Sequence, residues 1–147
     1  MSVSVQTHAF DTAAEIALLS TDTAGAVASF VGLVRGGDGL VALELEHYPG
    51  FTEAEIARIE AAARERFDLI DTRIVHRYGA MKPGEAIVLV AASSKHRRDA
   101  LLAVDFLMDY LKTDAPFWKR ELRADGATWI EPRADDRVAR AAWETET

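Results

Sequence analysis

Residues 86–112, AIVLVAASSKHRRDALLAVDFLMDYLK, carry a buried strand that is followed directly by a long helix. The run of apolar residues at 86–92 is typical of a strand that is covered on both faces. The helix is predicted over 95–112, and apolar side chains at helical spacing form its buried face: Leu101, Val104, Met108 and Leu111. It must end before Pro116, because proline disfavours helix in the residue that precedes it and has no backbone N–H to donate.

Further strands are predicted on both sides of this unit, at residues 25–35, 40–48, 72–78, 117–122 and 127–131. Residues 40–48 alternate between apolar and polar side chains, which is the pattern of a half-buried strand. The last two strands flank Asp125-Gly126, a dipeptide that favours a hairpin turn. These segments predict a substantial sheet.

Two further helices are predicted to begin at capping boxes, Thr12-x-x-Glu15 and Thr52-x-x-Glu55. The second box opens a helix of about fifteen residues, and a short helix is predicted to close the chain from about Ala134. Helices and strands thus alternate unevenly along the sequence. We therefore expect an α+β fold, a mixed or antiparallel sheet with packed helices, in a single domain over residues 1–147.

The composition indicates one soluble domain, because 49% of the 147 residues are hydrophobic and can form a sizeable core. The longest apolar run is far shorter than a membrane span, and the N-terminal residues lack the features of a secretory signal, so we expect a cytoplasmic protein. The net charge of -7 argues against a general nucleic-acid binder. The lack of cysteine excludes a disulfide, a thiolate metal site and a sulfur relay within this chain.

Lysine is scarce in this sequence and unevenly placed. Only four of the 17 basic residues are lysines, and two of these, Lys112 and Lys119, flank Pro116 and the aromatic pair Phe117-Trp118. A lysine can lose its proton when it is buried or crowded by other cations and then act as a base or nucleophile, which arginine does not do. Lys112 and Lys119 are therefore candidate catalytic residues. The alternative is two solvated surface lysines beside a Trp118 that belongs to the core.

A second group of cations lies at the predicted start of helix 95–112, after Ser93 and Ser94, which suit a helix cap. Cations are unfavourable there, because the N-terminus of a helix already carries partial positive charge. His96 and Arg97, together with the free backbone N–H groups, would form a cradle for a phosphate or carboxylate. Alternatively, these cations point outward to acidic neighbours.

Single residues elsewhere give weaker signals. Arg35 lies between a predicted strand and a glycine-rich loop, where it can clamp an anion or be an ordinary surface charge. His47 shares the apolar face of strand 40–48, so we expect it in the core or in a pocket wall. The four histidines and the carboxylates form no metal-binding spacing, and we expect no cofactor.

Short segments spread in order over about residues 25–133 resemble the large, catalytic subunit family of molybdopterin synthase. The most specific are Leu45-Glu-His-Tyr-Pro-Gly50, Met108-Asp-Tyr-Leu-Lys112 and Ala115-Pro-Phe-Trp-Lys-Arg-Glu121. Phe30-Val-Gly-Leu-Val-Arg35 and Ser94-Lys-His-Arg97 also match the family pattern. Each segment is weak by itself, but together they are very specific.

The resemblance implies an α/β-hammerhead-like domain and a sulfurtransferase activity. In this family, cyclic pyranopterin monophosphate receives two sulfur atoms and becomes molybdopterin, the dithiolene ligand of the molybdenum cofactor. The sulfur arrives as a thiocarboxylate on the Gly-Gly C-terminus of a small ubiquitin-like subunit. The resemblance further implies a homodimer of the large subunit within a heterotetramer, and it suggests neither a nucleic-acid nor a membrane partner.

The resemblance also implies roles for individual residues. Lys112 and Lys119 would be catalytic, and the substrate would be bound by Leu33, Val34, Arg35, His96, Arg97, Arg120, Glu121 and Arg133. Leu33 departs from the family pattern, which usually has a lysine at this position. The composition alone also permits a different class of function, a non-catalytic anion-binding or adaptor domain for a ubiquitin-like partner.

Overall fold

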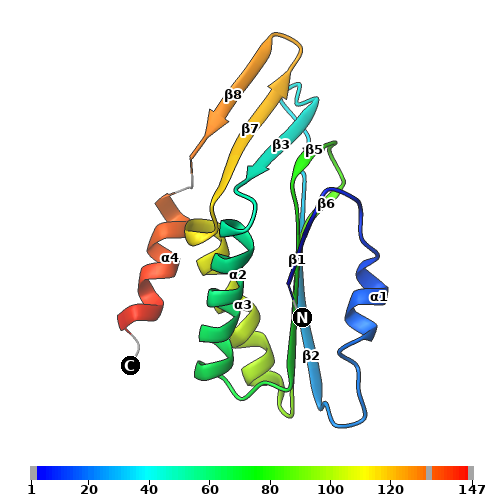
Figure 1. Cartoon of the computed structure of the whole chain (residues 1–147), viewed down its shortest axis with the longest axis vertical. Helices are drawn as coiled ribbons and strands as arrows, with labels where there is room; N and C mark the ends of the chain where they lie inside the picture. Colours follow the sequence, from blue (N-terminus) through cyan, green and yellow to red (C-terminus); the bar gives the residue numbers. More distant parts are fainter. Residues whose placement is uncertain (1–2, 132–133, 146–147) are drawn as a thin grey trace.

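The computed structural model describes residues 3–131 and 134–145 of the chain, in which two four-stranded sheets and four helices form an α+β fold (Figure 1). The helices are α1 (Thr12–Ala17), α2 (Phe51–Arg66), α3 (Arg97–Asp114) and α4 (Ala134–Thr145). None of the helices in these ranges is long and apolar enough to cross a membrane. The strands are β1 (Val3–Gln6), β2 (Ala26–Leu33), β3 (Ala42–His47), β4 (Asp71–Arg77), β5 (Gly79–Met81), β6 (Ala86–Ser94), β7 (Phe117–Arg123) and β8 (Gly126–Ile130).

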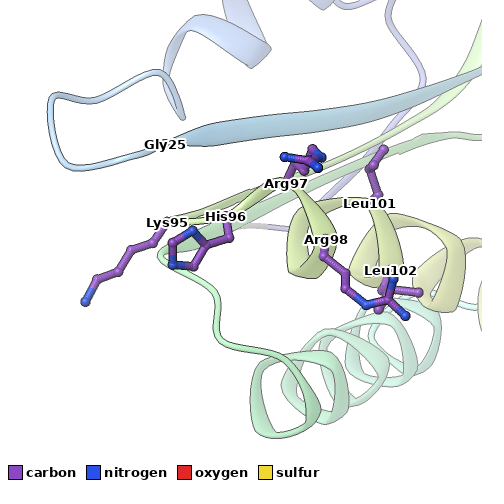
Figure 2. Close-up of a pocket in the computed structure, with 7 residues that line it drawn as sticks. All are labelled: Gly25, Lys95, His96, Arg97, Arg98, Leu101 and Leu102. Carbon is purple, nitrogen blue, oxygen red and sulfur yellow. The ribbon is translucent and has the colours of Figure 1, made fainter.

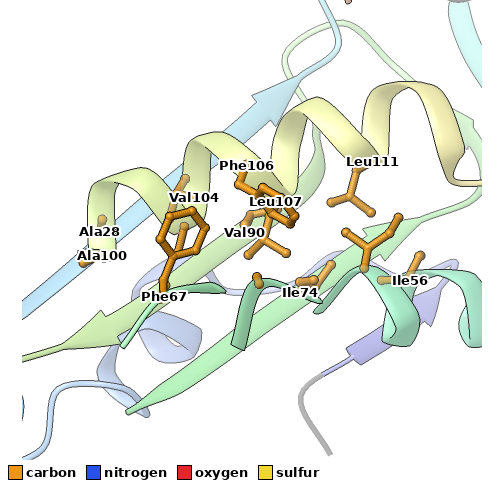
Figure 3. Packing of buried hydrophobic residues seen from close by; sticks show 14 of the residues in the cluster. Ala28, Ile56, Phe67, Ile74, Val90, Ala100, Val104, Phe106, Leu107 and Leu111 are labelled. Atoms are coloured by element: carbon orange, nitrogen blue, oxygen red, sulfur yellow. The ribbon is translucent and has the colours of Figure 1, made fainter. Parts of the chain in front are cut away.

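The first sheet has the order β1-β4-β6-β2 and carries the main core. β6 lies inside the sheet and pairs antiparallel with both of its neighbours, whereas β1 and β4 are parallel, so the sheet is mixed as predicted. Figure 3 shows α3 packed on this sheet, with Val104, Leu107 and Leu111 facing Val90 and Ile74. The apolar run that begins β6 is buried because the sheet is covered at its centre.

The second sheet, with the order β5-β3-β7-β8, extends beyond the helices and ends in the β7–β8 hairpin (Figure 1). The predicted Asp125-Gly126 turn is confirmed, because Arg123 pairs with Gly126 across it. The predicted sheet is therefore divided in two. The prediction missed the short strands β1 and β5.

Helix α3 differs in detail from the prediction. It begins at Arg97, because Ser93 and Ser94 are still part of β6, where both are buried. Leu101 is 60% exposed and was wrongly assigned to the core. The buried stripe is shifted around the helix and consists of Ala100, Ala103, Val104, Phe106, Leu107 and Leu111. The helix ends at Asp114, before Pro116, as predicted.

The predicted capping threonines are not the caps. Asp11 caps α1 by accepting a hydrogen bond from the backbone of Ala14, and Gly50 precedes α2 with a φ of 84°, which glycine adopts without strain. The fully buried Thr52 links the start of α2 to the second sheet: its hydroxyl accepts from the N–H of Tyr48 (2.8 Å) and donates to the carbonyl of Pro116 (3.1 Å). Thr52 thus fixes the chain just before β7.

Helix α4 closes the main core with Trp143. The indole packs edge-on against Phe67 and Phe106, and its Nε1 donates to a carboxylate oxygen of Asp109 at 2.7 Å. The guanidinium of Arg66 lies over the indole, 5.2 Å from the ring centroid. These contacts attach the C-terminal helix to α2 and α3.

Replacing Trp143 with alanine is therefore expected to lower the free energy of unfolding by about 3 kcal/mol, because it removes a buried aromatic ring and leaves a cavity. Urea unfolding measures the change. Val138→Ala is the matched control on the same helix: Val138 is 71% exposed, so its truncation should change stability by less than about 0.5 kcal/mol. Equal effects of the two substitutions would contradict the role of Trp143.

Candidate active site

The junction of α3 and β7 brings the two candidate catalytic lysines close enough to affect each other's charge. Lys112 lies in the last turn of α3 and is exposed, whereas Lys119 lies on β7 and is half-buried. Burial, and then the positive charge of Lys112, lower the pKa of Lys119, while Asp136 and Glu121 partly oppose this shift. At a given pH, Lys119 therefore has a larger neutral fraction than an exposed lysine.

A histidine that the sequence did not single out completes this cluster. His76 lies on β4, and its half-buried ring stacks on Phe117 at 3.9 Å between centroids. Burial, together with Lys112 and Lys119, lowers the pKa of His76 to about 4. One sequence signal was available: alternation along β4 puts His76 on the same face as Ile74, which faces the helices.

Arg120 does not join the lysines. Side chains alternate along β7, so Phe117, Lys119 and Glu121 share one face and Arg120 lies on the other. There it forms an ion pair with Glu44, and its guanidinium stacks 5.0 Å from the ring centroid of Trp129. Its Nε is buried without a hydrogen-bond partner among the described residues. The predicted grouping of Arg120 with the lysine pair is therefore wrong for a single chain.

Trp118 lies on the same face as Arg120 and is 53% exposed, so its assignment to the core was also wrong. Its indole N–H donates to the hydroxyl of Tyr48, and its ring meets that of Trp129 edge-on. Glu121, on the lysine face, forms an ion pair with Arg123 at 2.8 Å. The two faces of β7 thus differ in character: one carries Trp118 and Arg120, and the other carries Phe117, Lys119 and Glu121.

An open hollow of about 490 Å³ lies where β3 passes the start of β5. Its lining includes Glu44, Glu46 and Arg120. His47 and Tyr78 also line it, and their ring centroids are 3.8 Å apart with the planes tilted by 30°. His47 is therefore a pocket-wall residue, as predicted. The hollow combines acidic and basic groups and has no uniform charge.

The cationic start of α3 forms a second hollow, of about 710 Å³ (Figure 2). Lys95, His96, Arg97 and Arg98 line it and are exposed, and in the part of the chain that the structure describes no carboxylate forms an ion pair with them. The alternative in which these cations point to acidic neighbours is therefore not supported. Gly25 lies beneath them, where a Cβ atom would come within 2.0 Å of the carbonyl oxygen of Lys95.

The remaining predicted substrate residues lie at the far end of β2. Val34 is buried and exchanges backbone hydrogen bonds with Gly84 and Glu85, whereas Leu33 is 57% exposed and Arg35 is exposed just beyond the strand. The eight residues of β2 span about 26 Å, and this length separates Arg35 from Gly25 and the start of α3. A single chain therefore does not bring Arg35 to His96 and Arg97.

Two further points concern possible ligands. Arg133 lies outside the described residues. Within those residues, the histidines and carboxylates form no cluster of three or more that could hold a metal ion.

Comparison with known proteins identifies the family. A model of the family described as MoaE protein matches residues 5–114. The chain is 51% identical to a molybdopterin synthase catalytic subunit of Brucella melitensis over 98% of this chain and 91% of that protein. It is also similar to a solved molybdopterin biosynthesis MoaE protein of Burkholderia ambifaria, with a TM-score of 0.85, 47% identity and 99% of each chain covered.

The fold extends to more distant proteins. A protein–protein complex of subunits 1 and 2 of molybdopterin-converting factor from Helicobacter pylori contains a chain with a TM-score of 0.78 and 22% identity, covering 90% of this chain and 92% of that one. From the matched segment, and from relatives of about half-identical sequence over nearly its whole length, the chain belongs to the MoaE family, the catalytic subunits of molybdopterin synthase.

Proposed function

We propose that this chain converts cyclic pyranopterin monophosphate to molybdopterin, using sulfur from the C-terminal thiocarboxylate of a small ubiquitin-like subunit. The observation that carries the proposal is the lysine pair at the α3–β7 junction, Lys112 and Lys119, in a chain without cysteine. In each transfer the tail sulfur bonds to a substrate carbon, which loses its carbon–oxygen bond, and the displaced oxygen departs with its own group. Water then breaks the carbon–sulfur bond of the tail, and its oxygen remains on the spent tail as a carboxylate.

The two lysines have different roles in this proposal. Lys112 is exposed at the end of α3, so an incoming tail can reach it, and we place it nearest the thiocarboxylate carbon. Lys119 is half-buried with a lowered pKa, and it positions the pterin and balances negative charge that develops during transfer.

Lys112→Ala is expected to reduce sulfur transfer by at least about a hundredfold without unfolding the protein, and Lys119→Ala to impair it. The assay is molybdopterin formation from precursor and thiocarboxylated partner. Lys112→Arg and Lys119→Arg are the informative controls, because they keep the charge but provide no neutral amine. Full function of both arginine variants would favour the anion-binding or adaptor alternative.

The substrate phosphate is proposed to lie on His96 and Arg97, with Arg35 supplied by a second copy of the chain. β2 is an edge strand without a charged side chain, and no other strand pairs with its outer edge in the described part of the chain. If two copies pair antiparallel along β2, two-fold symmetry places the end of one strand beside the start of the other. His96 and Arg97 of the partner subunit then approach Arg35, which completes a three-cation site.

Arg97→Ala is expected to weaken precursor binding by about tenfold, the loss of one charge-assisted hydrogen bond, with a smaller effect on binding of the small subunit. Calorimetric titration of each ligand measures the two effects. Arg58→Ala is the control, because Arg58 is exposed on α2 and pairs with Glu55 and Asp114, the latter at the opposite end of α3 from Arg97. If Arg97→Ala left the affinity for the precursor unchanged but abolished binding of the small subunit, this site would bind the small subunit and not the precursor.

The shared site has a further consequence that separates it from a single-chain site. Mixed dimers of an Arg35→Ala chain and an Arg97→Ala chain contain one doubly substituted site and one intact site. At a precursor concentration too low to saturate either variant, mixing the two impaired proteins should therefore raise activity to about a quarter of the wild-type value, from half of the sites in half of the dimers. No recovery after subunit exchange would place both arginines in the same chain's site.

The sulfur donor is proposed to be a separate small subunit, as the Helicobacter pylori complex of two subunits supports. A Gly-Gly tail has no side chains to recognise, so a channel beside Lys112, Lys119, Phe117 and Met108 receives it. The protruding β7–β8 hairpin, with its turn at Asp125-Gly126, offers part of the docking surface for the globular body (Figure 1). The body and the tail thus have separate tasks.

A small subunit that lacks its last two glycines is expected to bind with an affinity within about tenfold of the intact protein, because its body supplies most of the buried area, but to deliver no sulfur. Calorimetry of the truncated partner measures binding, and molybdopterin formation measures delivery. Complete loss of binding would show that the tail carries the affinity.

A further inference from the structure

His76 is fixed against the strand that carries Lys119, yet the proposed reaction gives it no role. Its ring stacks on Phe117 with the planes only 17° apart. Phe117 begins β7 and shares a face with Lys119 two residues later. The phenyl ring therefore holds the imidazole beside the lysine pair from one side.

The backbone holds the imidazole from the other side. Nδ1 lies 3.0 Å from the carbonyl oxygen of Arg77, and a carbonyl only accepts, so Nδ1 carries the proton and donates it. In a neutral ring, Nε2 is then the free acceptor. The strand end is rigid here, because the buried guanidinium of Arg77 donates to the carbonyl of Thr7 at 3.0 Å and pairs with Glu85 at 3.3 Å.

Burial is the main reason that the ring stays neutral, and the charges around it add to the effect. Burial, and then Lys112 from α3 and Lys119 from β7, lower the pKa of His76 to about 4, although the hydrogen bond to Arg77 opposes the shift. Two carboxylates act on Lys119, Glu121 of β7 and Asp136 of α4. Among the described residues, however, neither lysine forms an ion pair with a carboxylate. The histidine is thus an uncharged polar neighbour of two ammonium groups.

We propose that His76 is a positioning residue for sulfur transfer, an uncharged hydrogen-bond acceptor that orients the lysine amines without neutralising their charge. A carboxylate at this place would favour the charged form of both lysines and would repel the anionic thiocarboxylate. A purely apolar side chain would fill the space but would provide no acceptor. The proposal rests on the proposed function and assigns a further residue to the same site.

The direct test is the titration of Lys119 in His76→Asp. The chain has four lysines, so side-chain carbon-13 labelling gives four lysine signals, and Lys95 at the opposite end of α3 is an internal control. A new carboxylate beside the pair should raise the titration midpoint of Lys119 by about one unit and leave Lys95 unchanged. An unchanged Lys119 midpoint would overturn the proposal.

If His76→Asp does not fold, the titration of His76 in Lys119→Met is the second test. The titration midpoint of His76 should rise by about half a unit in this variant, and no rise would overturn the proposal.

His76→Phe keeps a ring on Phe117 but removes both nitrogens, so it loses the bond to the Arg77 carbonyl as well as the Nε2 acceptor. We expect sulfur transfer to fall about tenfold, the contribution of one hydrogen bond, while the melting temperature falls by only about 2–4 °C. A wild-type rate would mean that the ring serves packing alone and would overturn the proposal. If wild-type protein transfers no sulfur, the proposed function itself fails, whereas the lysine titration still decides whether His76 controls the charge of Lys119.

Discussion

At Ala115 and Pro116 the chain passes from α3 into β7 without a loop, and the position of both lysines depends on this turn. Pro116 ends the helix because it cannot donate a backbone hydrogen bond, and its carbonyl accepts one from the hydroxyl of Thr52. Thr52 is itself held by the backbone of Tyr48, at the end of β3. The end of α3 and the start of β7 are thus fixed to the second sheet by one buried side chain.

This arrangement draws the site from segments that are far apart in sequence. β4 contributes an imidazole, α3 one amine and β7 another, and only the last two are near each other along the chain. The first sheet supplies rigidity through its buried centre, while the second sheet extends outward and leaves the rings of Trp118 and Trp129 exposed. The candidate site takes residues from both sheets, because β4 belongs to the first and β7 to the second.

The sequence predicted the features that depend on local pattern: the β6–α3 unit, the stop before Pro116 and the β7–β8 turn. It failed where tertiary contacts decide. Thr52 looked like a helix cap but is used as a buried link, and Leu101 fitted the helical period but lies at the edge of the covered stripe. His76 was missed because its neighbours come from α3 and β7, which no spacing within β4 can reveal.

The uncharged outer edge of β2 also affects how the chain behaves before it finds a partner. Exposed strands of this kind are templates for uncontrolled pairing, and many proteins protect them with lysine, proline or an irregular end. The irregularity between Gly32 and Leu33 lies in the pairing with β6, so it leaves the outer edge unprotected, and the seven residues from Ala26 to Gly32 carry no charge. A chain whose β2 edge stays uncovered is therefore prone to aggregate as its concentration rises.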